Sequence, residues 1–185
     1  MGLATEKYIE KNSELVERCK RGDQKAQYEV YKLYSKAMYN ICFRFLKHEG
    51  EAEDVLQDAF VDAFTKIGGF RQESSFGLWL KQIVVNKAIN QLRARRLDFV
   101  DLDEGRVVPA EESQDGIVTE DEMNFEVQRV LKAIMDLPTG YRAVLSLYLL
   151  EGYDHEEISE VLDISESTSR TQYMRGKKKL LELLK

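Results

Sequence analysis

The chain has few of the residues that interrupt helices or build covalent cross-links. Two prolines occur in 185 residues, together with two cysteines, two histidines and one tryptophan. Scarce proline favours long helices, because proline disrupts a helix interior. No apolar run reaches the roughly 18 residues that span a bilayer, and the first ten residues lack the apolar core of a signal peptide. The sequence therefore predicts an all-α, cytoplasmic protein with no membrane insertion.

Residues that carry catalysis or hold metals are also missing from useful patterns. Cys19 and Cys42 fit no zinc-ligand spacing and lie among apolar helical neighbours, which predicts buried free thiols. The Glu-x-x-His pairs that build di-metal sites in helical bundles are absent, and both histidines are isolated. There is no phosphate-binding glycine loop and no nucleophile paired with a base. We therefore expect no metal, no cofactor and no enzymatic activity.

The net charge of −6 hides a strong segregation of charge along the chain. Residues 71–96 carry six Lys/Arg against one Glu, and residues 165–185 carry six against two. Residues 97–126 carry eleven Asp/Glu against one Arg, and residues 48–62 carry six acids and no Lys or Arg. Such asymmetry predicts nucleic acid at the basic segments and a basic protein surface at the acidic helix.

Periodicity divides the chain into two helical domains. Four amphipathic helices are predicted over residues 5–20, 23–47, 49–67 and 76–96, forming an N-terminal helical bundle in residues 1–96. Residues 97–119 are acidic, contain Gly and Pro and lack periodicity, which predicts a flexible acidic linker. Residues 120–185 form the second domain, with a helix to Leu137, a break at residues 138–140 and a helix over residues 141–150.

The end of the chain predicts a helix-turn-helix. Residues 155–162 carry Ile158, Val161 and Leu162 on one helical face, Asp163 and Ile164 make a break, and Ser165 stands where an N-cap belongs. The second helix then separates a packing face (Tyr173, Gly176, Leu180, Leu184) from a polar face (Thr168, Thr171, Met174, Arg175, Lys178). Arg and hydroxyl groups on such a face suit base edges of duplex DNA. A solvated basic helix is the simpler alternative.

Two further surfaces stand out in the first domain. The helix predicted over residues 49–67 has an unbroken apolar face, and opposite it Asp54, Gln57, Asp58, Val61, Asp62 and Thr65 form a stripe typical of a docking surface, or of a plain solvated face. The next helix aligns Trp79, Gln82, Asn86, Asn90 and Arg93, a pattern that suits single-stranded nucleic acid. Trp79 alone is better explained as a packing residue.

In these motifs the chain resembles the extracytoplasmic-function sigma factors of bacterial RNA polymerase over nearly its whole length. Residues 51–60 (EAEDVLQDAF) resemble the helix of that family that binds the polymerase clamp. Residues 70–96, with their Trp-Leu-x-x-Ile-x-x-Asn core, resemble its promoter-melting segment, and Leu137-Pro138 onward resembles its C-terminal domain. The resemblance implies a region 2 type bundle and a region 4 type helix-turn-helix domain.

The same resemblance implies a function and its residues. The protein would direct RNA polymerase to specific promoters for transcription initiation, in response to an envelope or extracellular signal relayed by an anti-sigma factor. Core RNA polymerase and promoter DNA, both duplex and melted, would be its partners. The implied polymerase contacts are Asp54, Gln57 and Asp58, and the implied DNA contacts are Phe70, Arg71, Ser74, Ser75, Asn86, Arg93, Arg142, Thr168, Arg170, Thr171, Met174, Arg175 and Lys178. Ser169, Gln172 and Gly176 depart from the residues that relatives often carry.

The sequence leaves two other function classes open. A two-domain helix-turn-helix regulator would bind duplex DNA without polymerase and would use the first domain for a ligand or a dimer. An interaction protein that decoys an anti-sigma factor would keep the acidic helix and need no DNA-reading face. The basic last helix argues against the decoy, and the residues 70–96 patch argues against the regulator.

Overall fold

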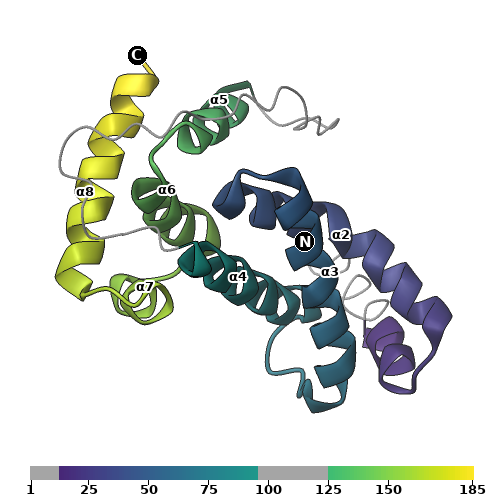
Figure 1. The fold of residues 1–185 in the computed structure, drawn as a ribbon. Coiled ribbons are helices and arrows are strands. Elements are labelled where there is room, and N and C mark those ends of the chain that lie inside the picture. Colours follow the sequence, from purple (N-terminus) through teal and green to yellow (C-terminus); the bar gives the residue numbers. More distant parts are fainter. Residues whose placement is uncertain (1–12, 96–124) are drawn as a thin grey trace, which may run out of the picture. The chain divides into compact units, whose positions relative to one another are not determined.

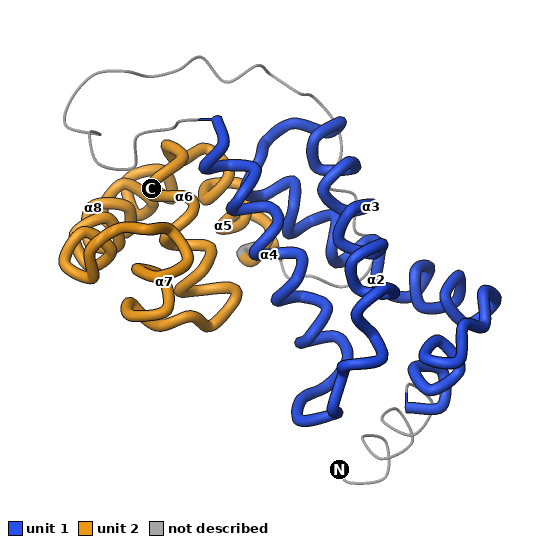
Figure 2. The backbone as a smooth tube through the Cα atoms, turned by 60° about the horizontal axis from the view of Figure 1, so that its bottom comes forward, with its two compact units in different colours: residues 1–95 blue, residues 96–185 orange. Residues whose placement is uncertain are grey.

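A computed structural model describes residues 13–95 and 125–185, and every element within these two ranges is helical or a turn, as predicted. The chain divides into two compact units, residues 1–95 and residues 96–185, which Figure 2 draws in blue and orange. The predicted linker, residues 97–119, and the predicted start of the first helix, residues 5–12, lie outside the described residues.

The first unit is built on three helices that pack pairwise: α2 (Gln24–Leu46), α3 (Glu49–Lys66) and α4 (Phe76–Ala94). A helical segment over residues 13–20 precedes them, and the short 3-10 turn η1 (Ile67–Gly69) follows α3 (Figure 1). The Asp23 side chain caps α2 by accepting from the Lys25 and Ala26 amides, and Ser75 caps α4. Three of the four predicted helices therefore begin and end within a few residues of their expected bounds.

The junction between α2 and α3 is tied to the end of α4. Lys47 takes the left-handed conformation with φ of 50° and ends α2, and His48 caps α3. Arg95, at the C-cap of α4, donates from Nη1 to the Leu46 carbonyl at 2.9 Å and pairs with Glu51. The three helix ends are thereby fixed to one another, so the outer faces of α3 and α4 belong to one rigid bundle.

Both cysteines are buried in this unit and form no disulfide, as the sequence predicts. Burial raises the pKa of the Cys19 thiol to about 11 and that of the Cys42 thiol to about 12. Thiolates are the reactive form, so neither side chain is suited to nucleophilic or redox chemistry at neutral pH.

The second unit contains α5 (Phe125–Met135), α6 (Thr139–Leu145), the π-helical segment η2 (Ser146–Glu151), α7 (His155–Leu162) and α8 (Glu166–Leu183) (Figure 1). Its core joins Ala133, Ile134 and Leu137 to Leu145 and Leu180. The helix predicted over residues 141–150 is correct in position, but it changes to a π-helical path at Ser146 and stops at Gly152, whose φ is 81°.

Candidate nucleic-acid and partner interfaces

Helices α7 and α8 form the predicted helix-turn-helix. Asp154 and Glu157 make a reciprocal capping box at the start of α7, and Asp163, with φ of 56°, turns the chain after it. The Ser165 hydroxyl then accepts from the Thr168 amide at 3.0 Å, which confirms the predicted N-cap of α8. The buried Ile158 and Leu162 hold α7 in the unit. The start of α8 is therefore fixed by both caps and packing.

The outward face of α8 is the polar face that the sequence predicted. Its exposed members are Arg170, Thr171, Met174, Arg175 and Lys178, while Thr168 is half-buried. Met174 is 72% exposed, a high value for an apolar side chain with no packing role. Hydroxyl, guanidinium and thioether groups lie together on this face, a combination that can meet both the polar edges and the methyl groups of bases in a major groove.

On this face Arg170 forms an ion pair with Glu166 in the free protein. Glu166 lies one turn earlier, and both side chains are about half exposed. An exposed pair of this spacing contributes little stability, so Arg170 can exchange Glu166 for a base or phosphate at small cost. Thr171 donates to the Ser167 carbonyl at 2.9 Å.

The residues at which the sequence departs from its relatives all lie on the inner face of α8. Ser169 is buried and lies 2.8 Å from His155 Nδ1, so it joins α8 to the start of α7. Gln172 is buried as well. At Gly176 an added Cβ would come within 3.0 Å of the Tyr141 Cβ and 3.1 Å of Leu145 Cδ1. The absence of a side chain at Gly176 therefore allows the close approach of α8 to α6, and none of the three departures alters the outward face.

Arg142 is a buried charged side chain of the second unit. The resemblance implied a contact with the DNA backbone, but this side chain is 5% exposed. Its Nη1 donates to the Leu137 carbonyl at 2.8 Å, and its Nη2 donates to Thr139 Oγ1 at 3.4 Å. Pro138 follows Leu137 and breaks the helix there, so the guanidinium satisfies a carbonyl at the end of α5. In this structure Arg142 supports the fold, and its contact with the DNA backbone stays a prediction.

Helix α4 presents the predicted polar stripe. Gln82, Asn86, Asn90 and Arg93 are exposed at spacings of three and four residues, so they share one face. Lys87 lies beside it and pairs with Asp62 of α3 at 3.3 Å. The hydrogen bond from Lys66, together with the one from Lys87, lowers the pKa of Asp62. Asp62 therefore belongs to a local charge network rather than to a free acidic surface.

The loop before α4 is built on an aromatic cluster. Phe70 is 6% exposed, with its ring centroid 5.2 Å from that of Trp79 and 5.7 Å from that of Phe76. In this structure the Phe70 ring packs within the cluster, and its contact with DNA stays a prediction. The exposed members of the loop are Arg71, Gln72, Glu73, Ser74 and Ser75. Trp79 is half-buried in the same cluster and packs as expected.

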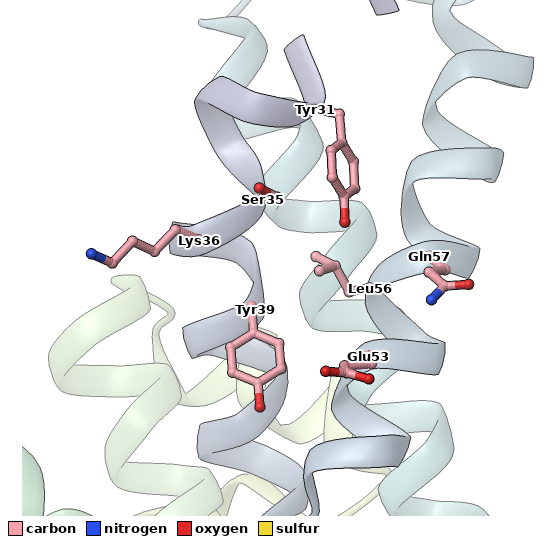
Figure 3. Close-up of a pocket in the computed structure, with 7 residues that line it drawn as sticks. All are labelled: Tyr31, Ser35, Lys36, Tyr39, Glu53, Leu56 and Gln57. Atoms are coloured by element: carbon pink, nitrogen blue, oxygen red, sulfur yellow. The ribbon is translucent and has the colours of Figure 1, made fainter. Parts of the chain in front are cut away.

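Helix α3 carries the predicted docking stripe on its exposed side. Asp54, Gln57 and Asp58 are exposed, and Val61 adds an apolar side chain that is 64% exposed. Beside this stripe an open groove of about 510 Å³ runs between α2 and α3. Figure 3 shows its lining, from α2 and from α3: Tyr31, Ser35, Lys36, Tyr39, Glu53, Leu56 and Gln57.

The contribution of α2 to this surface was missed by the sequence reasoning. Tyr31 lies edge-on to Phe60 with centroids 4.9 Å apart, and it is 37% exposed. Tyr28, three residues before Tyr31 on the same helix, is also exposed. Large apolar side chains on the outer side of a helix are a usable signal for a partner surface.

Metal binding and membrane insertion find no support in residues 13–95 and 125–185. Within these ranges no group of three or more His, Cys, Asp or Glu side chains could hold a metal ion. The same residues contain no helix that is long and apolar enough to cross a bilayer.

Two family models match the chain, one in each unit. Residues 30–97 match Sigma-70 region 2, and residues 127–180 match Sigma-70, region 4. The first match includes α3, the loop before α4 and the α4 stripe. The second includes all of α6 and α7 and the outward face of α8.

Similar curated proteins span nearly the whole chain. The ECF RNA polymerase sigma factor SigW of Bacillus subtilis is 30% identical over 177 residues, which cover 92% of this chain and 95% of that protein. The RNA polymerase sigma-H factor of Pseudomonas aeruginosa is 32% identical and covers 91% of each chain. The ECF RNA polymerase sigma-E factor of Escherichia coli K12 is 32% identical and covers 88% of each.

Solved structures with the same fold include CnrH, determined in complex with the cytosolic domain of CnrY. It is 25% identical, with a TM-score of 0.52, and the match covers 94% of this chain and 96% of that chain. The sigma factor RpoE of Bartonella quintana, solved with the anti-sigma factor NepR, is 22% identical with a TM-score of 0.51. The match covers 85% of this chain and 95% of that chain.

Proposed function

This chain belongs to the extracytoplasmic-function sigma factors of bacterial RNA polymerase, and from that premise we propose how its surfaces divide the work. As a sigma factor it binds core RNA polymerase and promoter DNA and directs the enzyme to specific promoters for initiation. The proposed domains are residues 1–96 for the polymerase and the minus-ten element, 97–119 as a linker, and 120–185 for the minus-thirty-five element.

The polymerase contact is assigned to α3 and its neighbourhood. Asp54, Gln57 and Asp58 lie on the exposed side of the helix, and the groove between α2 and α3 adds Tyr31 and Tyr39. Carboxylates beside a partly apolar groove suit a basic partner with some apolar side chains. We assign this surface to the clamp of the core enzyme.

The melted strand of the minus-ten element is assigned to the loop and the stripe of α4. An unstacked base would contact the exposed loop residues Arg71, Ser74 and Ser75. The strand that follows this base would contact Asn86 and Arg93. Phe70 and Trp79 shape this surface from beneath. Amide and guanidinium groups can hold single-stranded bases and phosphates without a duplex groove.

The duplex upstream element is assigned to the outward face of α8. Thr168, Arg170, Thr171, Met174 and Arg175 are the proposed readers, and Lys178 lies further along the helix, where it suits a phosphate. Neither DNA surface needs high affinity alone, because the polymerase holds both near one promoter and makes the second contact intramolecular.

The protein is proposed to act in the cytoplasm, to catalyse no reaction itself and to be held inactive by an anti-sigma factor. CnrH, whose fold it shares at 25% identity, was solved with the cytosolic domain of CnrY. A partner that covers the surfaces for polymerase would keep the factor from the core enzyme until a signal removes it.

The observation that carries the function is the exposed face of α8, with cationic, hydroxyl and thioether groups, in a chain that is related to ECF sigma factors over nearly its full length. The test is transcription from a library of randomised promoters by core polymerase with and without the protein. We expect a defined subset of promoters to be transcribed only when it is present. Duplex binding of the protein alone, with no promoter-dependent transcription, would instead identify an ordinary helix-turn-helix regulator.

A further inference from the structure

The loop that we assign to the flipped base is tied to a helix far from it in the sequence. Gln72 Nε2 donates to Glu17 Oε1 at 2.9 Å, and the same carboxylate oxygen accepts from Lys20 Nζ at 2.8 Å. Lys20 Nζ in turn lies 5.7 Å from the centre of the Phe70 ring. Glu17 and Lys20 belong to the helical segment over residues 13–20, which thus contacts the loop at two places.

The loop has a conformation that needs such support. Gln72 has φ of 59°, the left-handed region that residues with a Cβ rarely adopt. A residue in that region persists where its surroundings determine its conformation, and such positions gather at ligand-binding loops. The side-chain amide held by Glu17 is a contact that can fix Gln72 in this conformation.

The charges around Glu17 fit this role. The hydrogen bond from Lys20 lowers the pKa of the Glu17 carboxyl, despite the opposing effect of desolvation, so it is ionised at neutral pH. An exposed pair three residues apart contributes little stability by itself. Its effect here is to orient the carboxylate toward Gln72 and to place the ammonium group over Phe70.

We propose that Glu17 and Lys20 are positioning residues for the capture of the unpaired base: through Gln72 and Phe70 they hold the loop of residues 70–75 in a base-accepting shape. With Phe70 packed inward, Gln72 fixed by Glu17 and Ser75 capping α4, the loop is anchored at three points. Arg71, Glu73 and Ser74 then lie exposed between these anchors. Binding a base to a preformed loop avoids the entropy cost of ordering it. The inference rests on the proposed function of this loop.

The test measures binding of the reconstituted holoenzyme, made with the full-length chain, to a pre-melted promoter fragment chosen from the transcribed library. A second fragment lacks the base at the captured position. That position is identified beforehand by measuring how the unaltered protein binds fragments with single abasic substitutions along the melted strand. We expect Glu17→Ala and Gln72→Ala each to weaken binding to the intact fragment by about threefold to tenfold. The double variant should lose no more than either single variant, because the two residues form one contact.

The abasic fragment separates positioning from a general structural effect. With no base to capture, the variants and the unaltered protein should bind that fragment equally well. Glu14→Ala removes an exposed charge one turn earlier on the same segment, and we expect it to bind both fragments like the unaltered protein. Gln72→Ala changes an exposed loop residue, so the test survives if Glu17→Ala fails to fold.

Two outcomes would overturn the inference. Both variants could bind the intact fragment as tightly as the unaltered protein does, or they could lose the same affinity for both fragments. A distinct result would instead reject the proposed function of the loop. If no single abasic substitution weakens binding of the unaltered protein, then no base is captured there.

Discussion

Single buried polar side chains connect neighbouring helices of the second unit. Four polar residues are buried within the described part of the chain, Arg142, Ser146, Ser169 and Gln172, and all four belong to the second unit. Burying a polar group is costly unless it gains hydrogen bonds, and the hydrogen bonds of Arg142 and Ser169 fix the arrangement of their neighbours. Arg142 joins α6 to the end of α5, and Ser169 joins α8 to α7.

The burial of Arg142 separates two roles by their effect on stability. Arg142→Ala leaves the Leu137 carbonyl without this donor, so we expect the free energy of unfolding of the second unit to fall by about 1–3 kcal/mol. Arg175→Ala, on the exposed face of α8, should change it by less than about 0.5 kcal/mol. Chemical denaturation of both variants measures this. Unchanged stability of Arg142→Ala, with a loss in DNA affinity, would restore a DNA contact.

Gly176 gives a second test at this scale, because two effects of opposite sign compete there. Alanine gains up to about 1 kcal/mol in helix propensity, whereas overpacking costs about 1–3 kcal/mol. The Cβ would meet the Tyr141 Cβ at 3.0 Å, an atom next to the backbone that cannot move without α6. We therefore expect Gly176→Ala to lower the melting temperature, while Gly68→Ala, with open space around it, should not. A stabilised Gly176→Ala variant would mean that α6 and α8 can separate without loss.

Helices and their caps are the scale at which sequence reasoning succeeded. Ser165 caps α8 as predicted, because a short polar side chain before an amphipathic run satisfies the first amides of a helix. The inner and outer faces of α3 and α8 were also predicted, since a period of 3.6 residues sorts apolar from polar positions. Local chemistry alone decides such features.

Burial that depends on distant segments has no local signature. Phe70 and Arg142 are each buried by neighbours that only the folded unit supplies, and their contacts with DNA stay predictions. Arginine is among the residue types least often buried, so no pattern indicates an Arg142 turned inward. The contact between Glu17 and Gln72 joins residues 55 positions apart and has no local signature either.

The docking role of α3 predicts the effect of reversing its charge. Asp54→Arg combined with Gln57→Ala should abolish association with core polymerase and leave the fold intact, because both side chains are exposed and lie away from the buried face. Co-purification with the core enzyme measures the first effect, and thermal unfolding measures the second. Glu182→Arg, an exposed acidic position on α8, is the matched charge control. A folded double variant that still co-purifies would remove α3 from the polymerase contact.

The recognition role of α8 predicts different signatures for base and phosphate contacts. If Arg170 or Arg175 reads a base, its change to Ala should cost about 1–3 kcal/mol and relax preference at one position of the upstream element. A phosphate contact would weaken all sequences alike and lower the salt slope by about one unit. Binding of each variant across a promoter library at several salt concentrations distinguishes the two. Arg170 also loses its pairing with Glu166 on binding, so Glu166→Gln should raise affinity slightly.

The whole molecule consists of two units that each have their own core, a design in which separate surfaces can be brought to one promoter. We expect the factor to change its domain separation with its partner: a broad distribution alone, a long separation on core polymerase, and a short one when an inhibitor clamps the units together. Labels at Lys25→Cys and Glu182→Cys, which are exposed on α2 and α8, can measure this. Labelling at neutral pH is selective, because burial raises the pKa of Cys19 and Cys42 to about 11 and 12.

Clamping by an inhibitor has a thermodynamic requirement. To clamp the units, an inhibitor must bind the closed arrangement more tightly than the open one. This difference in binding free energy must exceed the free energy that the open arrangement gains by binding the polymerase. Distance distributions by pulsed electron spin resonance, recorded alone, with core polymerase and with a candidate inhibitor, test this directly. If the distance distribution is identical and narrow in all three samples, the units are rigidly joined. Inhibition must then work by covering the α3 surface or the α8 face, with no change in the distance between the units.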